Sequence, residues 1–370
     1  MTKVLLIFGT RPEAIKLCPV LLHLRARAGE FRVRCCVTAQ HRQMLDQVLQ
    51  VFEVKPDYDL NLMLPGQTLA QSSARILAAL EGVLAEDRPD IVLVQGDTTT
   101  TFCGALAAFY ARIPVGHVEA GLRTGDMAQP FPEELNRVLT TRLSAIHFAP
   151  TAGAAENLRR DRVPADRIVV TGNTGIDAVL QVDGKLSSGT LAGVDLPALD
   201  PSRRLLVVTA HRRENHGAPL EAICEALVRL ARRGDVQIVY PVHRNPNVMG
   251  PVERLLGGEA GIVLCEPLDY VPFVNLMRRA YLLITDSGGI QEEGPSLGKP
   301  VLVMREKTER PEAVEAGTVK LVGTDAARIV AAAEWLLEDR AEFERMSRAH
   351  NPYGDGHASE RIGDALAGWN

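Results

Sequence analysis

The fold is decided first by the stretch KVLLIFGTRPEAIK at residues 3–16. Val4–Phe8 is a run of five apolar residues, which is the length and composition of a strand buried on both faces of a parallel sheet. Gly9 and Thr10 then form a turn, and Pro12 suits the first turn of a helix. A strand, a turn and a helix in this order predict the opening βα unit of an α/β domain.

Short apolar runs of the same kind recur along the chain. The first half contains Val33–Val37, Ile91–Val94, Val115–Val118 and Ile146–Ala149. The second half contains Leu205–Val208, Val236–Tyr240, Ile262–Cys265, Leu282–Ile284 and Val301–Met304. Stretches with helical periodicity lie between them, among them Leu69–Glu86, Thr100–Tyr110, Leu220–Arg232 and Ala326–Asp339. This alternation predicts an α/β fold with two Rossmann-like, doubly wound domains that face a central cleft.

The segment from about residue 181 to residue 200 differs from the rest of the chain. It is rich in glycine, serine and proline and has weak periodicity, so we expect a linker there. A length of 370 residues also suits two domains. We therefore expect one domain at residues 1–180 and a second that begins at residue 201.

The composition excludes several classes of protein. Lys and Arg number 41 against 46 Asp and Glu, and this net charge of −5 argues against a dedicated nucleic-acid-binding protein. The apolar runs are too short for a membrane span or a signal peptide. The six cysteines form no Cys-x-x-Cys pair and the nine histidines lack metal-ligand spacing, so we expect no metal. Cysteines scattered in apolar segments indicate reduced core residues of a cytoplasmic protein.

The turn after the first strand is a candidate anion site. A helix that begins near Pro12 offers free backbone N–H groups at its N-terminus, and Arg11 and Lys16 add positive charge. The turn matches neither the dinucleotide-binding glycine pattern nor the P-loop. The alternative is a plain strand–helix turn with two solvated cations.

Three carboxylates follow successive strands and are candidates for acid–base chemistry. Asp97 lies in QGDTTT at 95–100, Glu119 in HVEAGLR at 117–123, and Glu133 opens a helix after Pro130 and Pro132. Carboxylates gathered at one sheet edge raise one another's pKa, which can produce a base or an acid near neutral pH. The alternatives are that Asp97 only caps a helix, and that Glu119 and Glu133 pair with Arg123 and Arg137.

Strand ends in the second half carry a different set of side chains. His211 and His243 each follow an apolar run, and each precedes an arginine. Ser287, Gly288 and Gly289 begin a helix whose backbone amides can approach a pyrophosphate closely. Glu293 follows about one helical turn later, where a carboxylate can accept ribose hydroxyls. A lone histidine in either place would more often be structural.

Taken together, these residues resemble the bacterial non-hydrolysing UDP-N-acetylglucosamine 2-epimerases. The resemblance spans nearly the whole chain through ordered motifs: GTRPEAIK at 9–16, QHRQM at 40–44, PGQT at 65–68, QGDTTTT at 95–101, HVEAGLRTGD at 117–126, FPEELNR at 131–137, HRREN at 211–215, YPVHRNP at 240–246, DSGGIQEEGP at 286–295, ERPE at 309–312 and NPYGDGHASERI at 351–362.

The resemblance implies a glycosyltransferase-B-type fold and a reversible epimerisation without a cofactor. UDP-GlcNAc is converted to UDP-ManNAc by elimination of UDP to 2-acetamidoglucal and re-addition, which feeds cell-surface polysaccharide synthesis. The family commonly forms homodimers. The C-terminal helix, at about residues 353–370, is expected to cross back onto the first domain, so the second domain is expected to span residues 201–352.

The resemblance also implies roles for individual residues. Asp97, Glu119, Glu133 and His211 match catalytic positions: Asp97 and Glu133 for proton transfer at C2, Glu119 for charge stabilisation or proton relay, and His211 for the leaving diphosphate. The division among the acids can be permuted. The positions implied in substrate binding are Arg11, Lys16, Phe273, Ser287, Gly288, Gly289, Glu293 and Arg310. The positions implied in activation by a second UDP-GlcNAc are Gln40, Gln43, Gln67, Arg212 and His243, for which ordinary polar cleft lining is the alternative.

Other functions compete with this interpretation. The nearest are a 2-epimerase of a 3-acetamido or uronic acid UDP-sugar and a hydrolysing 2-epimerase that releases ManNAc. A glycosyltransferase on the same fold is a further alternative, and it predicts an acceptor pocket. A sugar-nucleotide-sensing protein without turnover is another, but it is expected to lack part of the carboxylate set, which is complete in this chain.

Overall fold

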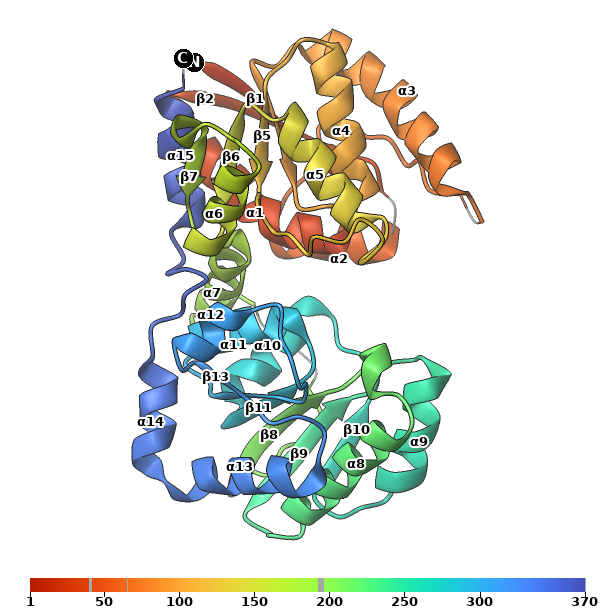
Figure 1. The fold of residues 1–370 in the computed structure, drawn as a ribbon, viewed down its shortest axis with the longest axis vertical. Helices are drawn as coiled ribbons and strands as arrows, with labels where there is room; N and C mark the ends of the chain where they lie inside the picture. Colours follow the sequence, from red (N-terminus) through yellow and green to blue (C-terminus); the bar gives the residue numbers. More distant parts are fainter. Residues whose placement is uncertain (40–41, 65, 192–195, 370) are drawn as a thin grey trace. The chain divides into compact units, whose positions relative to one another are not determined.

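A computed structural model describes residues 1–39, 42–64, 66–191 and 196–369 (Figure 1). The chain divides into two compact units. The first unit consists of Met1–Ala178 and Tyr353–Asn370, and the second consists of Val179–Pro352. Each unit is a parallel sheet with helices between successive strands.

In the first unit, the described residues form a seven-stranded sheet in the order β3-β2-β1-β4-β5-β6-β7. Its strands are β1 (Thr2–Phe8), β2 (Phe31–Val37), β3 (Tyr58–Asp59), β4 (Ile91–Gln95), β5 (Val115–Val118), β6 (Ile146–Ala149) and β7 (Ile168–Val170). Its helices are α1 (Arg11–Ala26), α2 (Arg42–Val51), α3 (Leu69–Asp87), α4 (Thr99–Tyr110), α5 (Glu133–Leu143), α6 (Ala152–Arg160) and α15 (Ala358–Ala367), while α7 (Thr174–Ser187) runs across the boundary between the units. The central strand β1 is buried on both faces, since Leu5, Leu6, Ile7 and Phe8 have no exposed surface.

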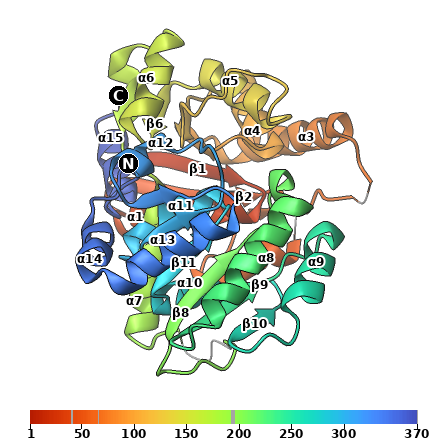
Figure 2. The same cartoon turned by 60° about the horizontal axis from the view of Figure 1, so that its bottom comes forward.

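The described residues of the second unit form a six-stranded sheet in the order β10-β9-β8-β11-β12-β13. Its strands are β8 (Arg204–Thr209), β9 (Val236–Pro241), β10 (Ile262–Cys265), β11 (Leu282–Thr285), β12 (Val301–Val303) and β13 (Val319–Leu321). Its helices are α8 (Ala218–Ala231), α9 (Pro246–Leu256), α10 (Tyr270–Arg279), α11 (Gly288–Ser296), α12 (Pro311–Glu315), α13 (Ala326–Glu338) and α14 (Arg340–Arg348). Helices α8 and α13 pack side by side (Figure 2) and contribute to one apolar core with β8, β9 and β11.

The predicted α/β fold class is confirmed, and each of the ten predicted apolar runs is a strand. Three observed strands were not predicted: β3, β7 and β13. All three are edge strands, each two or three residues long, and their side chains are mostly half-buried or exposed. β3 and β13 each contain a charged residue and so lack a continuous apolar run, whereas β7 is apolar throughout but only three residues long.

The expected linker at 181–200 begins too early, because α7 continues to Ser187. Ala178, Val179 and Val182 are buried at helical spacing, and this periodicity outweighs Gly184 within the helix. The described part of the expected linker that lies outside the helix is Ser188–Leu191 and Leu196–Asp200.

The C-terminal segment belongs to the first unit, where α15 packs on α1 (Figures 1 and 2). Asp177 on α7 is almost fully buried and accepts the backbone N–H groups of Ala358 (3.2 Å) and Ser359 (2.7 Å). A carboxylate in this position satisfies amides that the first turn of α15 would otherwise leave unpaired. Within the described ranges, no helix has the length and apolar character needed to cross a bilayer.

Candidate active site

The predicted site residues gather at equivalent places in the two sheets. The strand order reverses between β1 and β4 in the first unit and between β8 and β11 in the second. At such a switch point the loops beyond the carboxyl ends of the two strands leave a crevice where α/β proteins bind ligands. Arg11 and Asp97 follow β1 and β4, while His211 and Ser287 follow β8 and β11.

Glu119, directly after β5, has a backbone conformation that is rare for its residue type. Its φ is 64°, in the left-handed region that non-glycine residues seldom adopt. Its carboxylate is paired with the ammonium group of Lys16 on α1 and accepts a hydrogen bond from the Gln95 amide at the end of β4. Strained backbone conformations that the surroundings enforce cluster at functional sites, and the two donors fix this carboxylate in one orientation.

Asp97 lies in the loop between β4 and α4 and is held by α5. Its Oδ2 accepts two hydrogen-bonding contacts from the Arg137 guanidinium, at 2.8 Å from Nε and 2.7 Å from Nη2. Asn136 donates to the backbone carbonyl of Asp97 at 2.8 Å. The side chain of Asp97 keeps 27% of its surface exposed, so the carboxylate is oriented and still accessible.

The alternative, in which Glu119 and Glu133 pair with Arg123 and Arg137, is wrong because both arginines bind other carboxylates. Arg123 binds Asp161, with 2.9 Å between Nε and Oδ2, instead of Glu119. Arg137 binds Asp97 and also Glu134, with 2.9 Å between Nη1 and Oε2. The expected partner Glu133, at the start of α5, has a buried Oε2 that accepts no hydrogen bond from the described residues. One of its oxygens is therefore left for a ligand or water.

Two buried side chains in this unit support the predicted acids, and neither is a predicted site residue. Glu13 accepts the N–H groups of Gly9 (3.1 Å) and Thr10 (2.8 Å) on Oε2. Its Oε1 accepts the hydroxyls of Thr98 (2.7 Å) and Thr101 (3.1 Å). Glu13 thus ties the loop after β1 to the start of α4, and complete burial raises the pKa of its carboxyl group.

The second is His117 on β5, which has no exposed surface. Its Nε2 lies 2.7 Å from the carbonyl oxygen of Gly96, next to Asp97. Burial lowers the pKa of His117 to about 3, so the imidazole is neutral at physiological pH and Nε2–H donates to that carbonyl. His117 therefore supports the loop that carries Asp97. Arg11, at the start of α1, is half-buried and makes no hydrogen bond or ion pair with the rest of the described chain.

The start of α11 in the second unit has the features of an anion site. The Ser287 hydroxyl does not cap the helix within the described structure, so the hydroxyl and the first amides remain for a ligand. Arg310 lies against Gly288: a Cβ at that glycine would lie 2.5 Å from the guanidinium carbon. Arg310 donates to Glu292 at 2.5 Å, which holds the cation beside the helix start.

Two further predicted nucleotide contacts lie on α10 and α11. Glu293 lies on α11 and is electrostatically coupled to Tyr270, the first residue of α10. Burial and the Glu293 charge raise the pKa of Tyr270 well above its ordinary value, so its hydroxyl remains protonated. Phe273 is half-buried on the same helix, one turn after Tyr270.

His211, directly after β8, lies between two partners. Its Nδ1 is 3.4 Å from Oδ1 of Asp286, and its ring stacks on that of His243 with centroids 5.6 Å apart and planes inclined by 16°. Burial is the largest influence and lowers the pKa of His211. The Asp286 charge opposes this lowering, while Arg212 and His243 add to it.

The residues expected to bind an activating second UDP-GlcNAc are distributed over both units. Arg212 lies 3.7 Å from Glu309, and its Nε is buried without a partner in the described structure. Gln67, before α3, has a buried Oε1 that likewise accepts no hydrogen bond from described residues. Gln40 lies outside the described residues, and Gln43 falls within the backbone of α2. The described residues contain no group of three or more His, Cys, Asp and Glu side chains that could hold a metal ion.

These features define a Rossmann-like α/β protein of two units, with polar and charged side chains at the switch point of each sheet. A family model described as UDP-N-acetylglucosamine 2-epimerase matches residues 23–367, and the chain therefore belongs to this family. It is 58% identical over 369 residues to the UDP-N-acetylglucosamine 2-epimerase of Escherichia coli O157:H7, with 98% of each chain covered.

Solved structures agree with this assignment. The crystal structure of UDP-GlcNAc 2-epimerase from Neisseria meningitidis bound to UDP-GlcNAc has a TM-score of 0.88 at 49% identity, covering 98% of this chain and 99% of that one. The co-structure of Staphylococcus aureus MnaA with UDP has a TM-score of 0.82 at 48% identity, covering 98% and 95%. The glycotransferase of kitacinnamycin, at 15% identity and a TM-score of 0.65, shares the fold alone.

Proposed function

We propose that this chain interconverts UDP-GlcNAc and UDP-ManNAc by inverting C2 of the sugar. The observation that carries the proposal is the oriented pair Asp97 and Glu119 at the carboxyl edge of one sheet, with Glu133 opening the helix that follows. The similarity to 2-epimerases over 98% of the chain supports the same substrate. Elimination and re-addition need no redox cofactor, so none is proposed.

The proposed reaction balances without an added reactant. A base removes the proton from C2 while the bond between C1 and the UDP oxygen breaks, which forms 2-acetamidoglucal and UDP. An acid then protonates C2 from the opposite face, and UDP re-forms the bond to C1. The transition state carries positive charge near C1 and negative charge on the diphosphate, so fixed groups of opposite sign stabilise it.

The acids of the first unit suit the sugar. We assign proton transfer at C2 to Asp97 and Glu133, one for each face. Glu119, held by Lys16 and Gln95, suits stabilisation of the charge that develops at C1 because it needs no reorientation during the reaction. Arg11, and Lys16 beside Glu119, supply the positive charge that we assign to the diphosphate.

The second unit suits the nucleotide. We assign the diphosphate to Ser287, Gly288, Gly289 and Arg310, because backbone amides at a helix start and a guanidinium both bind phosphate oxygens. We assign the ribose hydroxyls to Glu293 and the uracil ring to Phe273. His211 supports the departing diphosphate.

One NMR experiment tests the function. The protein is incubated with UDP-GlcNAc in deuterated water, and the products are followed over time. A mixed pool of UDP-GlcNAc and UDP-ManNAc with deuterium at C2 is the expected result. Free ManNAc with UDP would indicate the hydrolysing alternative, and transfer to an added acceptor would indicate a glycosyltransferase. The 3-acetamido and uronic acid UDP-sugars, supplied in parallel, should react at least tenfold more slowly, about 1.4 kcal/mol.

We also propose that UDP-GlcNAc activates the enzyme through Gln40, Gln43, Gln67, Arg212 and His243. The stacking of His243 on His211 supports this proposal, because a ligand on His243 would contact a neighbour of the leaving group. The reverse reaction, started from pure UDP-ManNAc, should show a lag that trace UDP-GlcNAc removes. Hyperbolic kinetics without a lag would contradict the proposal.

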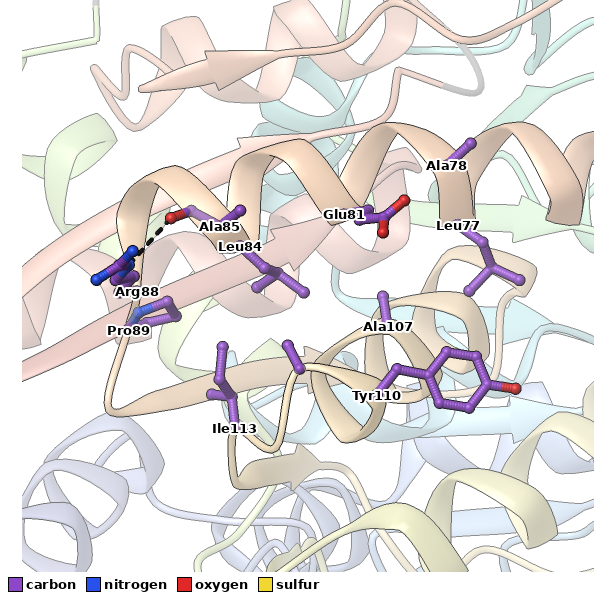
Figure 3. Close-up of a pocket in the computed structure, with 11 residues that line it drawn as sticks. Leu77, Ala78, Glu81, Leu84, Ala85, Arg88, Pro89, Ala107, Tyr110 and Ile113 are labelled. Carbon is purple, nitrogen blue, oxygen red and sulfur yellow. Dashed lines mark hydrogen bonds between the residues drawn. The ribbon is translucent and has the colours of Figure 1, made fainter.

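A homodimer is the third proposal for this protein. Helices α3 and α4 border a groove of about 650 Å³, lined by Leu77, Ala78, Glu81, Leu84, Ala85, Arg88, Pro89, Ala107, Tyr110, Ala111 and Ile113 (Figure 3). Tyr110 is 71% exposed and the adjacent Phe109 is 56% exposed. A surface that carries a groove, exposed aromatic rings and charges of both signs can pair with a copy of itself about a twofold axis.

Sedimentation analysis tests this surface. Tyr110→Glu places a charge in the groove and should shift a dimer toward monomer, whereas Met249→Glu on α9 should not. If Tyr110→Glu remains a dimer, the interface lies elsewhere on the protein. The six free cysteines suit a reducing compartment, and we propose that the enzyme is cytoplasmic.

A further inference from the structure

Asp286 connects the two loops at the switch point of the second sheet. It directly follows β11 and has no exposed surface. Its Oδ2 accepts three hydrogen bonds: from the backbone N–H groups of His211 and Arg212, both at 2.8 Å, and from the Asn215 side chain at 2.9 Å. The carboxylate therefore holds the backbone of the loop that carries His211.

The second oxygen of Asp286 differs from the first. Oδ1 is buried and accepts no hydrogen bond from the described residues, and the group that faces it is Nδ1 of His211 at 3.4 Å. A buried carboxylate oxygen without a donor is costly, so its place opposite an imidazole nitrogen calls for an explanation. A shortening of a few tenths of an ångström would complete a hydrogen bond from Nδ1–H to this oxygen.

A purely structural role would leave a different pattern. Asp177 has a purely structural environment, with each oxygen bonded to a backbone N–H group of α15. Asp286 concentrates its three structural bonds on one oxygen and presents the other to a side chain. The same loop continues into Ser287 and Gly288, so a single carboxylate sets the position of His211 relative to the start of α11.

We propose that Asp286 is a positioning residue that accepts Nδ1–H of His211 and so leaves Nε2 as the nitrogen that gains and loses a proton. The proposal rests on the proposed function of His211. As the C1–O bond breaks, Nε2–H donates its proton toward the departing diphosphate oxygen, and on re-addition the proton returns to Nε2. Asp286 stabilises the imidazolium form of His211, as in other carboxylate–histidine pairs.

The surroundings of His211 determine its pH dependence. The charged and titratable groups that face it are Asp286 after β11, Arg212 on its own loop and His243 after β9. Asp286 alone raises the pKa of His211, against burial and the neighbouring Arg212 and His243. Replacing Asp286 with a neutral residue therefore lowers this pKa, and activity that needs a protonated Nε2 is lost at a lower pH.

The wild-type protein provides the first test, which needs neither activity nor a variant. Two-dimensional ¹⁵N NMR of protein labelled at histidine reports which ring nitrogen carries the proton. The neutral form of His211 should be the Nδ1–H tautomer. A neutral Nε2–H tautomer would overturn the proposal even if the chain proves to be an active 2-epimerase, and the expected tautomer would stand even if it does not.

Asp286→Asn provides the second test, because its carbonyl oxygen can keep the three structural bonds while its NH₂ group faces Nδ1. The expected results are a fall in kcat of about 10²- to 10⁴-fold, a Kd for UDP within about threefold of wild type, and an inverted tautomer. The alkaline limb of the pH profile of kcat should move to lower pH. Asp235→Asn, the same substitution in an exposed ion pair of this unit, should change none of these.

A double substitution separates positioning from an independent role. If Asp286 acts through His211, the Asp286→Asn/His211→Asn protein should be no slower than His211→Asn alone, within about threefold. If the loss of kcat in the double variant equals the product of the losses in the two single variants, the proposal is overturned. If Asp286→Asn does not fold, the tautomer of His211 measured in the wild-type protein tests the proposal by itself.

Discussion

The two switch points have the same architecture and different chemistry. Each contains one fully buried carboxylate that ties neighbouring strand-end loops together: Glu13 in the first unit and Asp286 in the second. Glu13 has two donors on each oxygen, which are backbone N–H groups and threonine hydroxyls. Asp286 has three donors on one oxygen and a histidine opposite the other.

The difference teaches how to separate a structural carboxylate from one that acts on a neighbour. A carboxylate whose two oxygens are both hydrogen-bonded to fixed donors only holds loops in place. A carboxylate with one oxygen directed at a titratable side chain also shifts the pKa of that side chain. The histidines follow the same division. His117 is buried, neutral and bonded to a backbone carbonyl, while His211 is 37% exposed and lies beside a charge.

The largest expected effect tests whether the first unit performs the chemistry. Asp97→Asn keeps an acceptor for Arg137 but removes a base, so kcat should fall by about 10³- to 10⁴-fold with loss of C2–H exchange in deuterated water. The affinity for UDP should be unchanged, as measured by calorimetry. In the second unit Glu293→Gln should do the reverse: weaker UDP binding and a smaller change in kcat. Glu156→Gln, in an exposed ion pair on α6, is the control for both.

If Asp97→Asn exchanges C2–H at the wild-type rate, Asp97 is not the base and the assignment passes to Glu133 or Glu119. If it loses UDP affinity instead, the division of labour between the two units is wrong.

The second effect concerns stability and sharpens the contrast between the histidines. The pKa of His117 is about 3 in the folded protein against about 6.5 in an unfolded chain, so the stability contributed by its neutral form is present above pH 6.5 and lost as pH falls toward 3. The full loss is roughly 4–5 kcal/mol, or about 1.4 kcal/mol for each pH unit below 6. His117→Gln retains a donor for the Gly96 carbonyl but cannot titrate.

Urea unfolding of wild type and His117→Gln between pH 7 and pH 4.5 measures this difference. The free energy of unfolding of wild type should fall faster with acidification than that of the variant. Parallel curves would mean that His117 is accessible to protons in the folded state, which would contradict its structural role.

The third effect compares one glycine from each switch point. A Cβ at Gly9 would lie 2.1 Å from the Thr38 hydroxyl and 2.6 Å from that of Thr100, and these buried hydroxyls bond each other at 2.9 Å. Gly9→Ala should therefore lower the free energy of unfolding by about 2–4 kcal/mol. A Cβ at Gly288 meets the flexible end of Arg310, so Gly288→Ala should lower stability by about 1 kcal/mol or less and weaken UDP binding about tenfold. Equal stability losses would remove this distinction.

The sequence predicted the elements of this site better than their connections. Asp97, Glu119, His211 and Ser287 follow apolar runs, so their places at strand ends could be predicted from periodicity alone. Glu13 resembles an ordinary acidic residue in the first turn of a helix, because its threonine partners are 85 and 88 residues away. Asp286 is likewise separated from the backbone of His211 by 75 residues.

A signal for Asp286 was nevertheless present in the sequence. A carboxylate immediately after an apolar strand and before Ser-Gly-Gly lies at the first buried position of the loop, and a buried carboxylate needs donors. The donors themselves could not be predicted, because they depend on the order β8–β11 in the sheet. The pairing of Lys16 with Glu119 across 103 residues escaped prediction for the same reason.

The smallest effect tests whether Glu13 is only a structural carboxylate. Its pKa is raised in the folded protein, so the stability that its protonated form contributes is fully present below about pH 4.5 and is lost as pH rises through the raised value. Glu13→Gln removes this dependence: its carbonyl oxygen can accept the N–H groups of Gly9 and Thr10, and the threonine hydroxyls can rotate to accept its NH₂ group. The variant should therefore gain stability relative to wild type between pH 4.5 and pH 7, by about 1.4 kcal/mol for each unit of pKa elevation, as measured by urea unfolding. Its kcat should change by less than about threefold with an unmoved pH profile, unlike that of Asp286→Asn. A shifted pH profile in Glu13→Gln would mean that the charge of Glu13 reaches Asp97, and the two buried carboxylates would then act in the same way.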